Sequence, residues 1–500
     1  MNNQNKVTTI VNSKYYSLLL FFVSFVFVTL FSRSTSFLYV FEGFDAAIFK
    51  QMGLAVLKGK TLYVDYFDNK GCILYFIQAL GLYLGGNFFI LIMQAISLTI
   101  TLIIWNKTIA FYREDRFCFV SLGIALFLLL CFYDGGDLSE EWCLPFASYP
   151  IFLYFRSLKS DKEIRRLEWF VIGICFGIIA FIRINNASAF LGFIAFLFIS
   201  YVRKKEFKKL FYDLFLFILG TLLISGICFL YFYLKAGAEG IIKMFYGTFL
   251  SYFNYFNTNY FNTDVKQKVF YTIIYILFLI ICITFHIINT PKQKEILIPT
   301  LISYAFFICS SGTRCYTHYL MALLPLIIVG IMTIKLDRYY KIYRILAFLT
   351  FFPLLCYIIK PIGFFVNDLV LNKEKAKDNY SEFHRCIEEI PLTERDSIYN
   401  YNLSGIGAGM MQHENLLQCN KVFYSLFAFK NKRIYDEVSQ NSHNAPRWVL
   451  FTWNRTYFKN DAYFILNNYD LYCEFTYDNT YLKKPKIGNN NQVYLYRRKD

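Results

Sequence analysis

The chain alternates long apolar runs with short polar segments over its first 360 residues. Many of the runs approach the ~20 apolar residues that a helix needs to cross the hydrocarbon core of a bilayer. The pattern predicts an α-helical multispan membrane protein with about eleven transmembrane helices. We expect these helices at Tyr15–Phe31, Phe88–Trp105, Phe117–Tyr133, Cys143–Tyr154, Glu168–Ile182, Ala187–Tyr201, Leu210–Leu234, Val269–Ile288, Ile296–Ser310, Tyr319–Ile334 and Ile342–Ile359.

Between the first two runs lies a polar loop, Phe41–Gly81, that carries several ionisable side chains. Its segment Asp45–Leu57 has the apolar spacing of a short amphipathic helix lying on a membrane surface. A second stretch, Ile73–Leu84, is too short to span a bilayer, and we interpret it as another interfacial helix. Charged groups beside a bilayer are costly to keep, so this loop is a candidate for function.

The loops between the runs differ in charge, and the difference predicts an orientation. The segments RSLKSDKEIRR, RKKEFKK, PKQKE and KLDRYYK are rich in Lys and Arg, whereas the opposite loops are acidic, neutral or sparsely basic. Because basic loops remain in the cytoplasm, we expect a cytoplasmic N-terminus in the cell (inner) membrane. The basic residues lie mostly in these short loops, so the net charge of +16 does not indicate nucleic-acid binding.

The composition changes after residue 360, and we divide the chain there into a transmembrane domain, 1–360, and a second domain, 361–500. The runs DSIYNYN, APRWVLFTWN and QVYLYRRKD are typical of short strands. We therefore expect a small α/β domain, and an odd number of spans places it outside the cytoplasm. The sequence GIGAG at Gly405–Gly409 lacks the full spacing of a nucleotide fingerprint, so we interpret it as a structural turn.

The 13 cysteines are scattered singly, without a CxxC motif or other metal-ligand spacing. We therefore predict no structural metal and no disulfide framework. The first apolar run is not followed by a small-residue cleavage site, so we interpret it as a retained span rather than a signal peptide.

Polar residues of the predicted outer loops lie within a few positions of a span end, so helix packing could bring them to one cavity. Carboxylates can take a proton from an acceptor hydroxyl, while cations can hold a phosphate leaving group. The candidates are Asp45, Asp65, Asp68, Lys70, Asp137, Glu140, Glu141, Arg183, Asn185, Arg314, Tyr316 and His318.

Each candidate also has a purely structural interpretation. Asp65, Asp68 and Asp137 could be turn residues, and Asp45, Glu140 or Glu141 could cap a helix. Arg183 could extend to the membrane interface, and His318 could be a packed interfacial histidine.

The first loop resembles that of bacterial glycosyltransferases of the GT-C fold, which are related to protein O-mannosyltransferases and to the transferase that adds aminoarabinose to lipid A. The resemblance lies in the run D-x-x-x-F…G…L-K-G-x-x-L-Y-x-D-x-F-D-x-K-G-x-x-L-Y-F, from Asp45 to Phe76. The segments GGDLSEEWCLPF, FIRINNA and GTRCYTHYLMALLP are similar in kind, so the resemblance covers roughly residues 15–335. The sequence departs from the family at Cys72, where proline is usual, and has FEGFD in place of an adjacent Asp-Glu pair.

The resemblance implies an inverting glycosyltransferase that moves a sugar from a polyprenyl-phosphate carrier to a glycan, lipid or protein acceptor at the outer face of the membrane. Asp45 would be the general base, and Lys70 would contact the donor phosphate. Charge and predicted topology add Arg183, Arg314 and His318 as phosphate contacts. Substrate or acceptor contacts would come from Asp65, Asp68, Glu140, Glu141, Asn185 and Tyr316. No metal or other cofactor is required, although Glu140 and Glu141 could also hold a divalent cation.

Three other functions compete with this one. An O-antigen ligase or polymerase would use similar donors, but the long loop Lys235–Lys268 is rich in Tyr, Phe and Asn rather than basic. A lipid or sugar transporter would place charges at mid-membrane or show paired repeats, and neither feature is visible. The third is a non-catalytic membrane scaffold.

Overall fold

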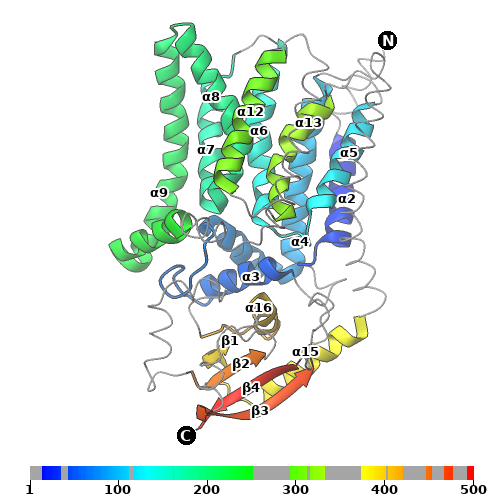
Figure 1. Cartoon of the computed structure of the whole chain (residues 1–500), viewed down its shortest axis with the longest axis vertical. Helices are drawn as coiled ribbons and strands as arrows, with labels where there is room; N and C mark the ends of the chain where they lie inside the picture. Colours follow the sequence, from blue (N-terminus) through cyan, green and yellow to red (C-terminus); the bar gives the residue numbers. More distant parts are fainter. Residues whose placement is uncertain are drawn as a thin grey trace, which may run out of the picture. The chain divides into compact units, whose positions relative to one another are not determined.

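In this computed structural model the chain forms two compact units (Figure 1). The first contains Met1–Ser32, Asn69–Leu74 and Leu91–Phe364, and the second contains Arg33–Asp68, Tyr75–Ile90 and Phe365–Asp500. Within them the structure describes residues 14–34, 43–111, 117–160, 163–251, 293–311, 316–332, 373–400, 404–419, 446–452, 467–476 and 492–499.

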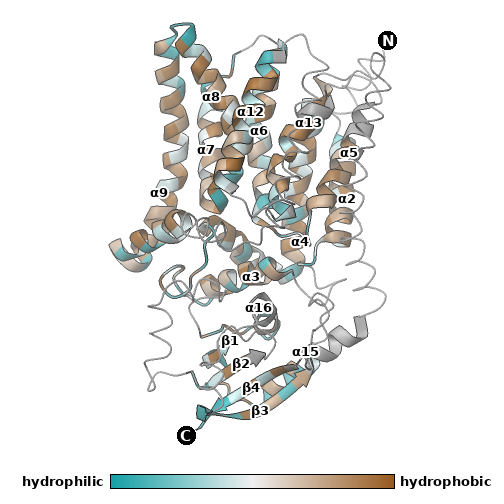
Figure 2. Ribbon diagram, in the orientation of Figure 1, coloured by the Kyte–Doolittle hydropathy of each residue, from teal (hydrophilic) through white to brown (hydrophobic). Residues whose placement is uncertain are grey.

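The first unit is helical, and its described helices overlap segments that we predicted as spans. Hydrophobic residues predominate along these helices, with hydrophilic residues at some of their ends (Figure 2). The helices are α2 (Lys14–Phe31), the second part of α4 (Cys72–Ala110), α5 (Phe117–Phe132), α6 (Ser139–Ser160), α7 (Arg166–Arg183), α8 (Ser188–Arg203), α9 (Phe207–Phe245), α12 (Gln293–Ser311) and α13 (Leu324–Met332). The predicted spans Val269–Ile288 and Ile342–Ile359 lie outside the described residues.

Four segments in the described part of the chain are long and apolar enough to cross a membrane. They are Lys14–Phe31, Cys72–Ala110, Arg166–Arg203 and Phe207–Leu250. The structure is thus mostly helical and compatible with a membrane protein.

Helix α4 is broken where the sequence changes from the predicted interfacial helix to the predicted span. Gly85 and Gly86 have non-helical backbone angles, and Gly86 has φ +66°. A side chain would strain that conformation, which glycine adopts readily. The prediction of two successive helices, Ile73–Leu84 and Phe88–Trp105, is confirmed.

The segment Arg166–Arg203 is also two helices, because the chain reverses between α7 and α8. The short 3-10 helix η1 (Ile184–Ala187) joins them. Lys209, in the first turn of α9, pairs with Glu163, just before α7, so the start of α7 and the end of α8 lie at the same end of the unit. Arg156 at the end of α6 pairs with Glu168 at that same end. This end of the first unit therefore holds two of the basic segments, RSLKSDKEIRR and RKKEFKK, and the α7–α8 turn lies at the other end.

The second unit contains a four-stranded sheet in the order β1-β2-β4-β3. Its strands are β1 (Ile398–Asn400), β2 (Trp448–Thr452), β3 (Tyr469–Thr476) and β4 (Gln492–Arg498). β1 is parallel to β2, and the remaining pairs are antiparallel. Helices α15 (Lys373–Glu388) and α16 (Ser404–His413) complete an α/β fold, whose core includes Phe383, Met411 and Trp448.

The predicted amphipathic helix of the first loop, α3 (Phe44–Leu57), belongs to this second unit. The Gln51 amide donates to the backbone carbonyls of Ala408 (3.2 Å) and Leu416 (3.0 Å). Lys58 donates to the carbonyl of Asn415 (2.7 Å), and the Tyr66 hydroxyl donates to that of Gln418 (2.5 Å). Burial raises the pKa of Tyr66 well above its ordinary value, so this hydroxyl stays a neutral donor. The first loop thus folds against α16 and the residues that follow it.

Three sequence predictions in the second unit need correction. GIGAG is not a turn, because it lies within the helix α16. Cys386 and Cys473 form a disulfide across 87 residues, although no disulfide framework was expected. Strand β3 was not predicted. Its pairing with β4 is irregular between Leu471 and Cys473, which interrupts the two-residue alternation that marks a strand.

Candidate functional site

A buried ion pair lies at the end of the first unit where α7 turns into η1. Arg183 Nη1 lies 2.6 Å from Glu140 Oε1, and the two side chains are 6% and 1% exposed. Ser139 Oγ donates to Glu140 Oε2 (2.9 Å), and the Arg183 guanidinium lies 4.3 Å above the Tyr319 ring. Arg183 is therefore held inside the protein and does not extend to a membrane interface.

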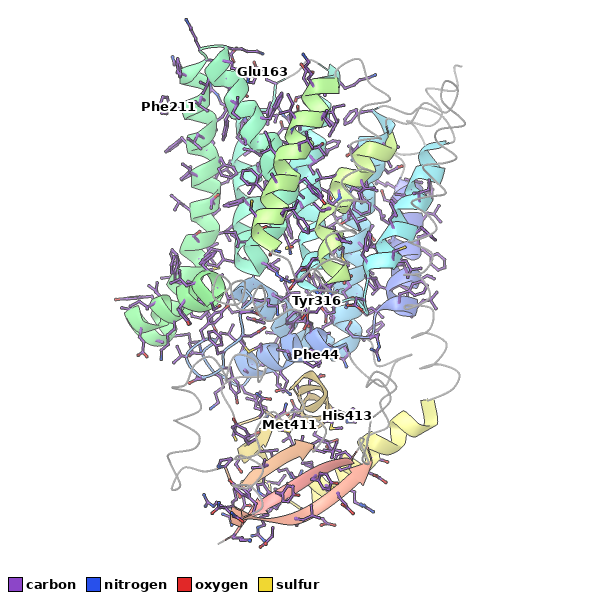
Figure 3. The ribbon with its side chains drawn as sticks, in the orientation of Figure 1. Phe44, Glu163, Phe211, Tyr316, Met411 and His413 are labelled. Atoms are coloured by element: carbon purple, nitrogen blue, oxygen red, sulfur yellow. A yellow bond between two sulfur atoms is a disulfide. The ribbon has the colours of Figure 1, made fainter. Side chains whose placement is uncertain are left out.

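A second polar contact joins the acidic loop Asp134–Asp137 to the short 3-10 helix η3 (Thr317–Leu323) at the same end. His318 Nδ1 lies 3.2 Å from Asp134 Oδ2. The His318 ring stacks on Tyr316, with centroids 5.5 Å apart, and meets Tyr319 edge-on at 4.9 Å. Tyr319 therefore contacts both Arg183 and His318. Figure 3 shows Tyr316 well separated from Glu163 and Phe211, which mark the opposite end of this unit.

The segment DGGD, from Asp134 to Asp137, is a tight loop that places Asp134 against His318. All four of its residues have positive φ, between 43° and 97°. Glycine adopts this region freely, and aspartate tolerates it better than most other residues. Glu141 accepts hydrogen bonds from the Asp137 backbone N–H (2.7 Å) and the Tyr133 hydroxyl (2.8 Å). Asp137 is thus a turn residue, as one interpretation held, and Glu141 fixes the turn.

The backbone around Lys70 is anchored in the same region by a hydrogen bond of the next residue, Gly71. The Gly71 backbone N–H donates to the carbonyl of Ile182 (2.9 Å), the residue before Arg183. A Cβ at position 71 would overlap the backbone of Phe181, so only glycine permits this approach. The backbone of Lys70 is therefore fixed beside the end of α7, although the two positions are more than 100 residues apart in the sequence.

The turn after Arg183 contributes Asn185, which is 3% exposed. Neither its amide nitrogen nor its oxygen has a hydrogen-bond partner among the described residues. The predicted residues Glu140, Glu141, Arg183, Asn185, Tyr316 and His318 thus meet at one end of the first unit.

The first-loop carboxylates lie in the second unit. Asp45 is in the first turn of α3, whose N-cap is Gly43, so Asp45 is not the capping residue. Asp65 accepts a hydrogen bond from the Thr61 backbone N–H (2.6 Å), which supports its interpretation as a turn residue. Asp68 is buried and accepts one from the Tyr75 hydroxyl (2.8 Å). Arg314 lies outside the described residues.

Sequence reasoning missed two members of the cluster, Asp134 and Tyr319. Asp134 is the first residue of the acidic loop DGGDLSEE, and Tyr319 directly follows His318. The run of two glycines between two aspartates was the available signal, since it predicts a strained turn that aims the first aspartate.

The cluster combines a buried carboxylate, a guanidinium and an imidazole with aromatic walls. Removing charges from water is costly, and a protein keeps such groups when they are paired or do chemistry. Arginine and histidine are suited to holding a phosphate, because they donate charge-assisted hydrogen bonds. Across the described residues, no group of three His, Cys, Asp or Glu side chains is arranged to hold a metal ion.

Residues 3–349 match the family model described as "Putative competence-induced protein Ccs4 N-terminal domain". The match covers more than half of the 500 residues. The chain belongs to this family. No curated protein matches the sequence.

The Ccs4 N-terminal region contains every candidate residue named above, from Asp45 to His318. The sheet and helices α15 and α16 lie beyond residue 349. The polar cluster is thus a feature of the family region, whereas the sheet lies outside it.

Proposed function

We propose that the protein is a glycosyltransferase that moves a sugar from a polyprenyl-phosphate carrier to a glycan, lipid or protein acceptor. The observation that carries the proposal is the hydrogen bond from Gly71 to Ile182. It joins the loop that bears Lys70 to the turn that bears Arg183, and these are two of the cations expected to hold the donor phosphate. His318 is linked to Arg183 through Tyr319.

In this proposal the chain is a multi-pass protein of the cell membrane, GT-C-like, with about eleven spans and a cytoplasmic N-terminus. Two observations support the orientation. Among the described residues, the two basic segments RSLKSDKEIRR and RKKEFKK lie at the end of the first unit opposite the polar cluster. The disulfide Cys386–Cys473 suits an oxidising compartment, in which disulfides persist, and so supports an extracytoplasmic second unit.

The proposed step is an inverting displacement. An acceptor hydroxyl oxygen attacks the anomeric carbon, and the bond from that carbon to the phosphate oxygen breaks. The acceptor proton passes to a carboxylate, which the resemblance assigns to Asp45. Polyprenyl phosphate leaves with its charge stabilised by cations such as Arg183 and Lys70. Asp65 and Asp68 have roles within their own loop, so Glu140, Asn185 and Tyr316 are the stronger candidates for substrate contacts.

The family name records induction in competence and states no chemistry. The described sequence and site therefore carry the proposal, and a transporter of the same lipid-linked sugar is its main competitor.

The test is an in vitro assay of membranes containing the full chain with a panel of polyprenyl-phosphate sugars, followed by mass analysis of what gains mass. We expect one donor to give a glycosylated product. Asp45→Asn should lower the rate by at least 100-fold, a size typical of a lost general base. Lys70→Ala should mainly raise KM for the donor.

Two surface variants at the opposite end serve as controls. Glu163→Gln matches the carboxylate change, and Lys208→Ala matches the lysine change; both should retain normal transfer. A normal rate of sugar transfer by the Asp45→Asn variant would show that Asp45 is not the general base. Movement of the lipid-linked sugar across liposomes, with no glycosidic product for any donor, would instead establish the transporter.

A further inference from the structure

The turn between α7 and α8 buries a group of polar side chains, and the proposed chemical step gives none of them a defined partner. Asn185, Asn186 and Ser188 are 3%, 1% and 2% exposed. Four of their atoms have no hydrogen-bond partner among the described residues: both polar atoms of the Asn185 amide, Asn186 Oδ1 and Ser188 Oγ. A buried polar atom without a partner costs about 1–3 kcal/mol, so such a group needs an explanation.

These side chains lie next to the charged cluster. Asn186 Nδ2 donates to Cys143 Sγ (3.5 Å). Cys143 follows Glu140 by three positions on α6, which places both on one face of that helix. Asn185 follows Arg183 by two positions in the chain. The amides therefore adjoin the Glu140–Arg183 pair.

A fourth side chain comes from the loop that carries Lys70. Asn69 is 6% exposed, and its Oδ1 also has no partner among the described residues. It lies two positions before Gly71, which is bonded to Ile182 at the end of α7. The turn and the loop thus bring neutral polar groups to the same end of α7.

The chemistry of these atoms indicates what they bind. Amide oxygens only accept hydrogen bonds, and three of the unpartnered atoms are amide oxygens, on Asn69, Asn185 and Asn186. The phosphate diester of such a donor is an anion without a proton to donate to them. A hydroxyl group both donates and accepts, so a ring bearing several hydroxyls satisfies amide oxygens, an amide N–H and a serine hydroxyl together.

We propose that Asn185, Asn186 and Ser188, with Asn69, bind the hydroxyl groups of the transferred sugar, while the cations beside them hold its phosphate. The inference rests on the proposed function and adds that the sugar is recognised through uncharged hydroxyls. It predicts that these residues determine which sugar is bound and contribute nothing to affinity for the lipid phosphate.

The test measures binding rather than turnover, so it stands apart from the transfer assay. Purified full-length protein is titrated with polyprenyl phosphate alone and with polyprenyl-phosphate glucose, galactose, mannose and arabinose. We expect one sugar-bearing lipid to bind at least tenfold more tightly than polyprenyl phosphate. Asn185→Ala should weaken that binding by about tenfold, the size of one or two hydrogen bonds, and change binding of polyprenyl phosphate by less than twofold.

Asn106→Ala, a buried asparagine near the far end of α4, is the matched control and should leave the ratio of the two affinities unchanged. Thermal unfolding of Asn185→Ala should occur at or above the wild-type temperature, because an unpartnered amide is removed. The inference is overturned if wild-type protein binds every lipid equally. It also fails if Asn185→Ala weakens both kinds of lipid alike, or weakens neither, as a site that holds only water would. Tight, sugar-selective binding without any transfer would instead contradict the proposed function alone.

Discussion

The two units bury polar side chains in contrasting ways. In the second unit, Gln51, Lys58 and Tyr66 donate to backbone carbonyls within α16 and in the residues just after it. The carbonyls that follow the helix have no partner within it, so the contacts to Asn415, Leu416 and Gln418 complete a fold. In the first unit, Arg183 bonds another charged side chain, and the side-chain amide of Asn185 beside it has no partner among the described residues.

The contrast separates a structural contact from a candidate site. A side chain that is hydrogen-bonded to a backbone group is not free to bind a ligand, because the ligand would have to break that hydrogen bond. Charged groups that bond other side chains, and amide atoms without a partner among the described residues, keep hydrogen-bonding capacity for a substrate. The first unit therefore holds the candidate phosphate and sugar contacts, and the contacts of α3 explain how the first loop acquires a fixed structure.

The largest effect is expected for the Glu140–Arg183 pair. Arg183→Met should destabilise the first unit by about 3–5 kcal/mol, because it leaves the Glu140 carboxylate buried without its cation. The double variant Glu140→Met with Arg183→Met should recover most of that loss. Denaturant-induced unfolding in detergent micelles measures both.

The solvent-exposed pair Lys243–Glu239 on α9 provides the control, since removing it should cost well below 1 kcal/mol. An Arg183→Met variant as stable as wild type would mean that Glu140 is not held by Arg183, and the contrast between the units would be lost.

Much of the fold could be predicted because it follows from local pattern. Helix α3 begins within one residue of its predicted start, and the division of Arg166–Arg203 into two helices follows from the polar residues around Arg183. The disulfide could not be predicted, because its cysteines are 87 residues apart and depend on how α15 packs on β3. The periodicity of apolar residues and the spacing of motifs describe residues close in sequence, whereas a disulfide between distant cysteines depends on tertiary structure.

The candidate site was predicted only in part for the same reason. Charge and loop position selected Glu140, Arg183 and His318. The importance of Asn186 and Ser188 lies in two atoms, Asn186 Oδ1 and Ser188 Oγ, that have no partner in the described part of the chain, and residue types alone cannot show this. The role of Gly71 depends on the backbone of Phe181, which the sequence does not place beside it.

A smaller effect is expected at the contact between the first loop and α16. Tyr66→Phe removes the donor to the Gln418 carbonyl and should destabilise the second unit by about 1 kcal/mol. Hydrogen exchange should become faster in α3 and α16 together, since the hydroxyl links the two segments. Tyr15→Phe is the control. Tyr15 is 85% exposed, so this change should leave hydrogen exchange in α3 and α16 unaltered. Faster exchange confined to residues near Tyr66 would show that the loop does not depend on this bond.

The smallest effect concerns a titrating pair on the surface of the second unit. The hydrogen bond to Glu414 (2.7 Å) raises the pKa of His384 above its ordinary value. Burial acts against ionisation of Glu414, but hydrogen bonds from His413 and His384 lower the pKa of Glu414 below its ordinary value. The His384 contribution is therefore complete below about pH 6.5 and is lost as the pH rises through its raised pKa. The Glu414 contribution is present above about pH 4.5 and is lost as the pH falls through its lowered pKa.

The second unit should consequently be most stable between about pH 4.5 and pH 6.5, by a few tenths of a kcal/mol, because His384 is half exposed and solvent screens the pair. Thermal unfolding of the full chain at pH 5.5 and pH 8.5 measures the difference, and His384→Asn should reduce it. If the wild type and His384→Asn lose equal stability on going to pH 8.5, another group causes the pH dependence. In that case the His384–Glu414 pair contributes nothing measurable to stability, as many exposed pairs do, in contrast to the buried Glu140–Arg183 pair.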